Sequence, residues 1–321
     1  MTTKRIRKDM NSNKKYESLY QRSKGQNKRR VFAYFLLKDG NESFDPWLPY
    51  RRLADLAQRE NWQSYEYEEG FERRKFPDGN LEILSSYLNF TFMRLQEEGK
   101  ILYSKDSGRA CFNTGLLSRR YGKDIYAFFE RNRNSSGGQD WFFKEFVTQS
   151  DAMRRKLLEG FAGFPPVAEY YNAENYRDLF FNLEYKTIIV AEHIVEDNVD
   201  RLPPKLRDDP NMAYSTIKGS TDKLYEKIRR NYKLAVPHWY GGRIQLLLPL
   251  YLMDADTQGP DLALVAERVD EQKCYVVKTI LTMSMAYKDA RIICRPNSDW
   301  LAVRNPQANR PAENEKETGR R

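Results

Sequence analysis

Three apolar stretches lie close together in the last third of the chain, and they constrain the fold more than any other feature. They span Ile244–Leu252, Leu262–Val269 and Cys274–Leu281. The first is an almost continuous apolar run, as expected for a strand covered on both faces. The polar sequence Asp270–Lys273 separates the other two as a turn would. This spacing predicts an antiparallel meander of three strands.

Shorter signals flank the meander. An apolar stretch at Thr187–Val195 predicts another strand, which contains His193, and Ser284–Ala290 predicts a short helix. The loop-like composition of Asn132–Gln139 marks a connection or a boundary within the body.

The first half of the chain is expected to be mainly helical. The strongest helix is predicted at 81–98, because its apolar residues recur in steps of three and four and Gly99 supplies a C-terminal stop. Two short strands at 101–103 and 110–112 follow, with a polar turn between them. A helix that feeds a hairpin fits a winged helix, although many α+β proteins contain such a step.

The fold class expected is therefore α+β, with a helical N-terminal half, winged-helix-like in one interpretation, packed against an antiparallel sheet in the C-terminal half. Residues 31–302 are expected to form the globular body, with a sub-boundary near 132–139, and residues 303–321 a flexible tail rich in Pro, Asn and Glu.

The positive charge of the chain is concentrated in residues 1–30, which we call the basic arm. Eleven Lys and Arg against two acidic residues give the arm +9, which equals the formal charge of the whole chain, so the body is neutral. With few apolar residues to bury, the arm is expected to be disordered. Its cations are Lys4, Arg5, Arg7, Lys8, Lys14, Lys15, Arg22, Lys24, Lys28, Arg29 and Arg30.

Several functional classes find no support in the sequence. Three widely spaced cysteines argue against a disulfide framework, and the N-terminus lacks a secretory apolar segment, so a cytoplasmic location is expected. The longest apolar run is too short to cross a membrane. With His193 and His238 as its only histidines, the chain has no zinc motif, and neither a hydrolase elbow nor a phosphate loop is present. We therefore expect no metal and no cofactor.

A nuclease-like string, Pro260-Asp261 followed by Glu271-Gln272-Lys273, is also present. Its chemistry needs the carboxylates and the lysine to converge on a metal. Because Glu271 and Lys273 fall in the predicted turn, we interpret the string as a chance match.

Cations beside aromatic residues point to nucleic acid in two segments of the body. In the first, a helix predicted from Ser220 runs into a Trp-Tyr-Gly-Gly sequence. The second extends from Met285, within the predicted helix at 284–290, to Trp300. Phosphates bind cations while bases stack on rings, which is how single strands are held. The alternatives are a solvated helix face for the first segment and an Arg291–Asp299 salt bridge for the second. The candidate contacts are Arg229, Arg230, Lys233, Tyr240, Arg243, Tyr287, Arg291 and Arg295.

Other polar residues lie near predicted strand ends, where pockets often form. These candidates for a pocket are Asn113, Thr114, His238, Asp261 and Asp299. His238 lies between Pro237 and Trp239, where a structural role is the alternative to a site residue.

Several long strings resemble the bacterial family called domain of unknown function 3825. They include YLNFTFMRLQEEGKI, ACFNTGL, NYKLAVPHWYGGRIQLLLPLYL, DLALVAERV and MAYKDARIICRPNSDWL, and they cover roughly residues 53–301. The resemblance implies relatives joined to cold-shock or LOTUS-type modules, which bind RNA. It supplies no catalytic residues.

Three functions remain open from the sequence. The first is a protein that binds RNA or single-stranded nucleic acid. The second is an enzyme that acts on RNA ends or nucleotides, with a site built from Asn113, Lys233, Arg243, Asp261, Arg291 and Asp299. The third is a non-enzymatic interaction protein whose arm binds anions.

Overall fold

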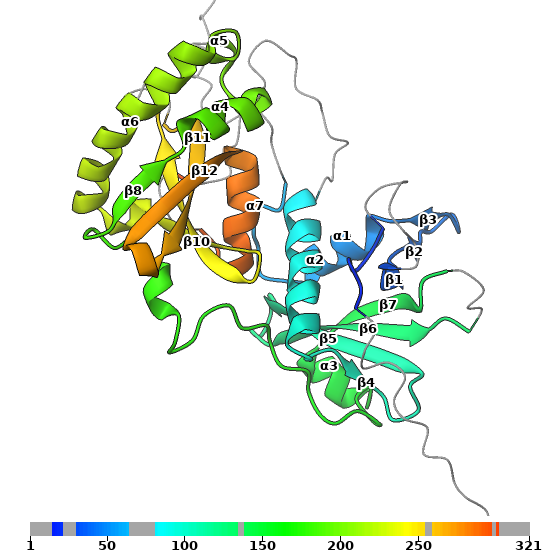
Figure 1. Ribbon diagram of the computed structural model, residues 1–321. Coiled ribbons are helices and arrows are strands. Elements are labelled where there is room, and N and C mark those ends of the chain that lie inside the picture. The colour runs from blue at the N-terminus through cyan, green and yellow to red at the C-terminus, as the bar shows by residue number, and fades with distance from the viewer. Residues whose placement is uncertain are drawn as a thin grey trace, which may run out of the picture.

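A computed structural model describes residues 15–21, 30–63, 81–133, 138–253, 259–296 and 300–301. Within these residues the chain forms two five-stranded sheets, with two helices side by side between them (Figure 1). No helix among the described residues has the length and apolar character needed to cross a membrane.

The N-terminal sheet has the strand order β1-β7-β6-β5-β4. Its long strands are β5 (Arg109–Leu117), β6 (Asp124–Arg131) and β7 (Trp141–Thr148), which form an antiparallel meander. The short strand β4 (Leu102–Tyr103) pairs with β5, and β1 (Ala33–Tyr34) pairs with β7 in the parallel direction. A small hairpin of β2 (Leu37–Lys38) and β3 (Phe44–Asp45) follows β1.

The C-terminal sheet has the order β8-β12-β11-β10-β9. The predicted meander is confirmed as β10 (Arg243–Leu250), β11 (Leu262–Val269) and β12 (Cys274–Thr282). Strand β9 (Val236–Tyr240) pairs with β10, and β8 (Lys186–Ile189) pairs with β12 in the parallel direction.

Helices α4 (Ala191–Asp197), α5 (Pro204–Arg207) and α6 (Pro210–Arg230) cover one face of the C-terminal sheet (Figure 1). Helix α6 begins at Asp209, whose side chain accepts a hydrogen bond from the backbone N–H of Met212 at 2.9 Å. The sequence prediction placed this start at Ser220, which instead lies inside the helix. Four apolar residues of α6 pack on the sheet, namely Ala213, Ile217, Leu224 and Ile228.

Helices α2 (Glu82–Glu97) and α7 (Met283–Ile293) stand side by side between the two sheets (Figure 1). The core around them includes Phe112 and Phe129 of the N-terminal sheet and Leu247 and Leu281 of the C-terminal sheet. Because one cluster contains side chains from both sheets, the two sheets share a continuous core. The remaining short helices are α1 (Leu48–Leu56), α3 (Gln149–Arg154) and the 3-10 turns Tyr176–Leu179, Val199–Arg201, Tyr232–Leu234 and Asp270–Gln272.

The prediction of a helical N-terminal half is wrong, although the α+β class holds. Helix α2 and the hairpin after it match their predicted positions, but the hairpin continues into a sheet of five strands, so a winged helix does not describe it. At the start of strand β7, buried and exposed side chains alternate strictly: Trp141 and Phe143 are buried, and Phe142 and Lys144 are exposed. This period of two is the signal of a half-buried strand.

The strand predicted at 187–195 is correct only for its first part. Strand β8 ends at Ile189, and His193 lies on helix α4 with its side chain exposed. Asn132–Gln139, predicted as a loop, connects β6 to β7 within one sheet.

Residues 15–21, which we call the clasp segment, pack against the body although they belong to the predicted basic arm. The backbone of the clasp segment runs beside β1, with hydrogen bonds from Phe32 N–H to Ser18 O and from Ala33 N–H to Leu19 O, both at 2.9 Å. Polar side chains of α2 hold its other side, where Asn89 Oδ1 accepts from Leu19 N–H at 2.9 Å. Tyr16 and Leu19 are buried. The prediction of disorder for residues 1–14 and 22–29 falls outside the described residues.

A buried ion pair links α7 to the segment before α2. Arg291 donates to both carboxylate oxygens of Glu60, with 2.8 Å between Nη2 and Oε2, and the side chains are only 11% and 7% exposed. The guanidinium also lies over two rings, 4.9 Å from the centroid of Trp62 and 4.6 Å from that of Tyr87. Both charges of the pair are therefore satisfied within the core, beside two aromatic rings.

We predict that Arg291→Met strongly destabilises the fold, by about 3–5 kcal/mol, because Glu60 is left as a buried charge without its partner. The double variant Glu60→Gln with Arg291→Met should lose less, since no charge remains buried. Denaturant unfolding of the full chain measures both changes.

The matched control is Arg295→Met, because Arg295 is exposed just beyond the end of α7. Its effect should stay within about 0.5 kcal/mol. Equal losses for the Arg291 and Arg295 variants would show that the buried pair is not important for stability.

Candidate nucleic-acid interface

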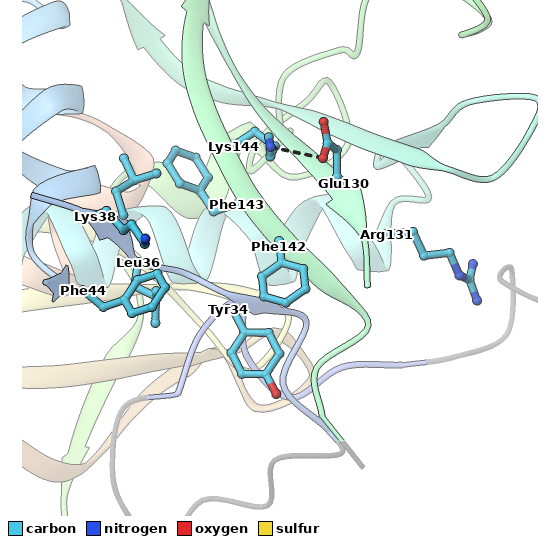
Figure 2. Close-up of a pocket in the computed structure, with 10 residues that line it drawn as sticks. Tyr34, Leu36, Lys38, Phe44, Glu130, Arg131, Phe142, Phe143 and Lys144 are labelled. Carbon is cyan, nitrogen blue, oxygen red and sulfur yellow. Dashed lines mark ion pairs between the residues drawn. The ribbon is translucent and has the colours of Figure 1, made fainter. Parts of the chain in front are cut away.

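A groove on the outer face of the N-terminal sheet combines exposed aromatic rings with cations. Its floor is formed where β1 pairs with β7, which places Tyr34 directly beside Phe142. The two rings are stacked, with centroids 4.9 Å apart and planes 19° apart (Figure 2). Phe142 remains 41% exposed. The stack therefore presents an aromatic surface to solvent.

The β2–β3 hairpin forms the wall of the groove. Phe44 on β3 is 65% exposed, and the ammonium of Lys38 on β2 lies 5.8 Å from the centroid of its ring (Figure 2). The turn of the hairpin is fixed by Asp39, whose Oδ1 accepts from the backbone N–H groups of Asn41 and Ser43, each at 2.9 Å. An exposed phenylalanine is thus held in place by a well-bonded turn.

The groove carries a positive balance of charge. Three cations line it, Lys38, Arg131 and Lys144, against one carboxylate, Glu130. Lys144 pairs with Glu130 at 3.1 Å across β6 and β7, while Arg131 points away from that pair (Figure 2). The volume of the groove is about 580 Å3.

Close packing fixes the orientation of Tyr34. A Cβ atom at Gly138 would collide with the Tyr34 hydroxyl, so only glycine allows this approach. The next residues of that loop are also anchored, because Asn132 donates to the backbone oxygen of Gln139 at 3.0 Å and Tyr16 of the clasp segment donates to Asp140 at 2.5 Å.

Such an arrangement can bind a polymer that carries planar rings and negative charges. Each base can stack on an exposed ring, and each phosphate can meet a cation at the rim. The rings belong to paired strands and to a fixed hairpin, so the free protein already holds them in place.

The first predicted cluster lies on a different surface. Arg229, Arg230 and Lys233 are exposed at the end of α6 and in the 3-10 turn after it. Arg230 pairs with Glu226 of the same helix at 2.6 Å. Beside them the exposed rings of Tyr232 and Phe180 lie 6.3 Å apart.

Tyr240 and Arg243 flank the Gly241-Gly242 turn between β9 and β10, where both are exposed. The two glycines have positive φ angles of 59° and 84°, as a tight hairpin requires. Arg243 pairs with Glu267 of β11 at 2.5 Å. These two residues lie at the opposite end of β9 from Lys233.

The second predicted cluster is divided between the core and the surface. Tyr287 and Arg291 are buried, and Arg291 pairs with Glu60. The alternative salt bridge to Asp299 involves a residue that the structure does not describe. Arg295 is exposed.

Three of the predicted pocket residues have structural roles. Asn113 donates to Asp124 Oδ2 at 3.2 Å and accepts from Gly115 N–H at 2.9 Å, which shapes an irregularity in β5. Thr114 donates to the Ile125 carbonyl at 2.8 Å. Asp261 accepts from the backbone N–H groups of Leu252 and Met253 and so closes the end of β10.

The described residues proposed for an enzyme site therefore do not meet in one place. Asn113 belongs to the N-terminal sheet, Asp261 to the start of β11, and Arg291 to the core beside α2. Asp261 also lies at the other end of β11 from Glu271 and Lys273, so the nuclease-like string does not converge. Within the described ranges, no three His, Cys, Asp or Glu side chains gather in a way that could hold a metal ion.

His238 is buried in β9, directly opposite Gln245 of β10. Neither ring nitrogen has a hydrogen-bond partner in the described part of the chain. Burial lowers the pKa of His238 to about 4, and the neighbouring Gln245 opposes the shift. The neutral form is therefore the one that the fold accommodates.

We predict that His238 makes the fold sensitive to acid. Its pKa is about 6.5 in the unfolded chain and about 4 in the fold, so stability is lost as the pH falls through this range, by about 3 kcal/mol in total. His238→Phe should remove this loss, as measured by unfolding at several pH values. The control His193→Gln replaces an exposed histidine and should keep the wild-type pH profile.

The sequence prediction missed every residue of the groove. The missed residues are Tyr34, Lys38, Phe44, Arg131, Phe142 and Lys144. The alternation in 141–144, with Phe142 and Lys144 on the exposed face, was the available signal. The parallel pairing of β1 with β7 joins segments more than 100 residues apart, which no local pattern reveals.

The comparison with family models identifies one family for this chain. The model of the domain of unknown function (DUF3825) matches residues 53–300, well over half of the chain. The chain therefore belongs to this family, as the resemblance in its sequence indicated. No curated protein and no solved structure matches it.

Proposed function

We propose that this member of the DUF3825 family is a protein that binds RNA or another single-stranded nucleic acid, and that the groove on the N-terminal sheet is its main contact surface. The observation that supports the proposal is the stacked pair Tyr34–Phe142, which lies beside Phe44 and a rim of three cations. Stacking on aromatic side chains contributes about 1–3 kcal/mol per base.

A single strand fits this groove better than a duplex. Bases of a duplex are already stacked on their neighbours, whereas those of a single strand are free to lie on Phe142 and Phe44. The cations of the groove also lie near the rings, so one strand can place its phosphates and its bases there together.

The end of α6 is proposed as a second contact. Arg229, Arg230 and Lys233 are exposed there beside Tyr232 and Phe180, so the same pairing of cations with rings recurs. The basic arm is proposed to add affinity that does not depend on sequence. Because the clasp segment is part of the fold, a test of the arm should delete residues 1–14 and leave 15–21 in place.

Two further expectations follow from the sequence. The resemblance implies relatives joined to cold-shock or LOTUS-type modules. Because those modules bind RNA, such relatives would support RNA as the partner of this protein. We also propose a cytoplasmic location, with which the three free cysteines agree.

We predict that Phe142→Ala weakens binding of a single-stranded RNA by about tenfold, since one stacking contact is lost. Fluorescence anisotropy with a labelled oligonucleotide measures the affinity. Phe142 is exposed, so thermal unfolding should change little.

The matched control is Tyr121→Ala. Tyr121 is 65% exposed in the β5–β6 turn, where Arg120 lies 5.2 Å from the centroid of its ring, but it does not line the groove. If both variants bind as the wild type does, or both lose affinity equally, the groove is not the contact surface.

We also predict that Lys38→Ala and Arg131→Ala each make binding less dependent on salt. Loss of one phosphate contact lowers the slope of log K against log salt by about 0.7 for a single strand. The slope is obtained from affinities measured at several salt concentrations.

Lys156→Ala serves as the control for charge, since Lys156 is exposed next to α3 and outside the groove. It should leave the slope unchanged. Slopes that are equal in all three variants and the wild type would contradict a role for these cations at the rim.

A further inference from the structure

A second cavity lies on the other side of the segment that forms the floor of the groove. Tyr34 and Leu36 line both the groove and this cavity, so only the chain around β1 separates the two. The second cavity has a volume of about 680 Å3. This falls within the range of roughly 300–1,000 Å3 that is usual for small-molecule sites.

One side of the second cavity is aromatic. Tyr20, Trp47 and Tyr50 line it. The rings of Tyr20 and Trp47 both pack on the ring of Tyr50, with centroid distances of 5.6 Å and 5.7 Å. Tyr20 belongs to the clasp segment and Trp47 and Tyr50 lie at the start of α1. The walls of the cavity are thus built by segments that the fold holds firmly.

The other side of the second cavity is polar. Helix α2 contributes Glu82, Ser85 and Ser86 from its first turns, and α7 contributes Lys288, which pairs with Glu82 at 3.6 Å. The lining of the cavity therefore combines aromatic rings with hydrogen-bond acceptors and donors, as in a site that recognises the edge of a planar ring.

Gln139 gives the cavity an unsatisfied acceptor. It lines the cavity and is 4% exposed, and its buried Oε1 has no hydrogen-bond partner among the residues that the structure describes. A buried acceptor without a donor costs about 1–3 kcal/mol, so such groups are rare in folded proteins and need an explanation. A ligand with an N–H group would supply the missing donor once the carboxamide turns toward it.

We propose that the second cavity receives one nucleobase with an exocyclic amino group, from the same strand that lies in the groove. The amino groups of adenine, cytosine and guanine can donate to Gln139 Oε1 and to the Glu82 carboxylate. Uracil offers a single N–H between two carbonyl oxygens, which these acceptors repel. The cavity would thus give a strand held by stacking a preference, at one position, for a base with an amino group over uracil.

This proposal rests on the proposed function, and the experiment separates the two. The full-length protein is titrated with a short oligouridylate and with strands in which one uridine at a time is replaced by adenosine, cytidine or guanosine. Replacement at one position is expected to tighten binding by about tenfold, which corresponds to one well-formed base contact.

Gln139→Leu is the main variant. It should abolish the gain from the replaced base and leave the affinity for oligouridylate unchanged. Because it removes an unsatisfied acceptor and keeps the backbone bond from Asn132, it should not lower the melting temperature. Glu82→Leu, which removes the carboxylate acceptor, provides a second variant with the same expected loss of preference. Gln272→Leu, at an exposed turn of the C-terminal sheet, is the matched control.

Four results would overturn the proposal. If no strand binds, the proposed function fails together with it. If strands bind but show no base preference, or if the preference survives both variants, the cavity does not read a base and the groove alone explains binding. If adenosine monophosphate alone binds as tightly as the replaced strand, the cavity is a site for free nucleotides.

Discussion

The buried pair of Arg291 and Glu60 holds together the centre of the molecule. A charge placed between two sheets is costly unless it is paired and fully bonded. Here the guanidinium meets both carboxylate oxygens and lies over the rings of Trp62 and Tyr87. This contact joins α7, which follows the C-terminal sheet, to the segment that leads into α2, which packs on the N-terminal sheet. That junction lies against Trp62 and Tyr87, which belong to the core that the two sheets share.

The groove depends on contacts of the same long-range kind. Strand β1 has only two residues, yet it is held by β7 on one side and by the clasp segment on the other. Asn89 and Gln96 of α2 bind the backbone of the clasp segment, so the helix at the centre of the fold also supports the floor of the groove. The same segment around β1 lines the second cavity, whose polar side is built by α2 and α7. The groove and the second cavity are therefore positioned by the same helices that form the core.

Local patterns in the sequence were enough to predict the helices and strands whose apolar residues form one clear run or recur at one regular spacing. The meander of β10, β11 and β12, helix α2 and its stop at Gly99 were all predicted, because apolar runs and steps of three and four report directly on burial. The helical interpretation of the N-terminal half failed because β5 and β6 each have five successive buried residues and so lack a clear period of two, and because β1 pairs with a strand distant in sequence. For the site, the cation–aromatic rule was applied to α6 and α7, where it selected Arg291. Arg291 is a cation beside aromatic rings, as the rule requires, but it is buried and its charge is paired with Glu60.

The central claim is that single-stranded nucleic acid lies on Tyr34, Phe44 and Phe142. Ultraviolet cross-linking of a bound RNA to the full-length protein, followed by mass spectrometry of the peptides, tests it most directly. The groove predicts adducts on peptides that contain these three residues, with competition by unlabelled RNA. Adducts confined to Tyr232, Tyr240 or the basic arm would contradict it and would place the binding surface elsewhere.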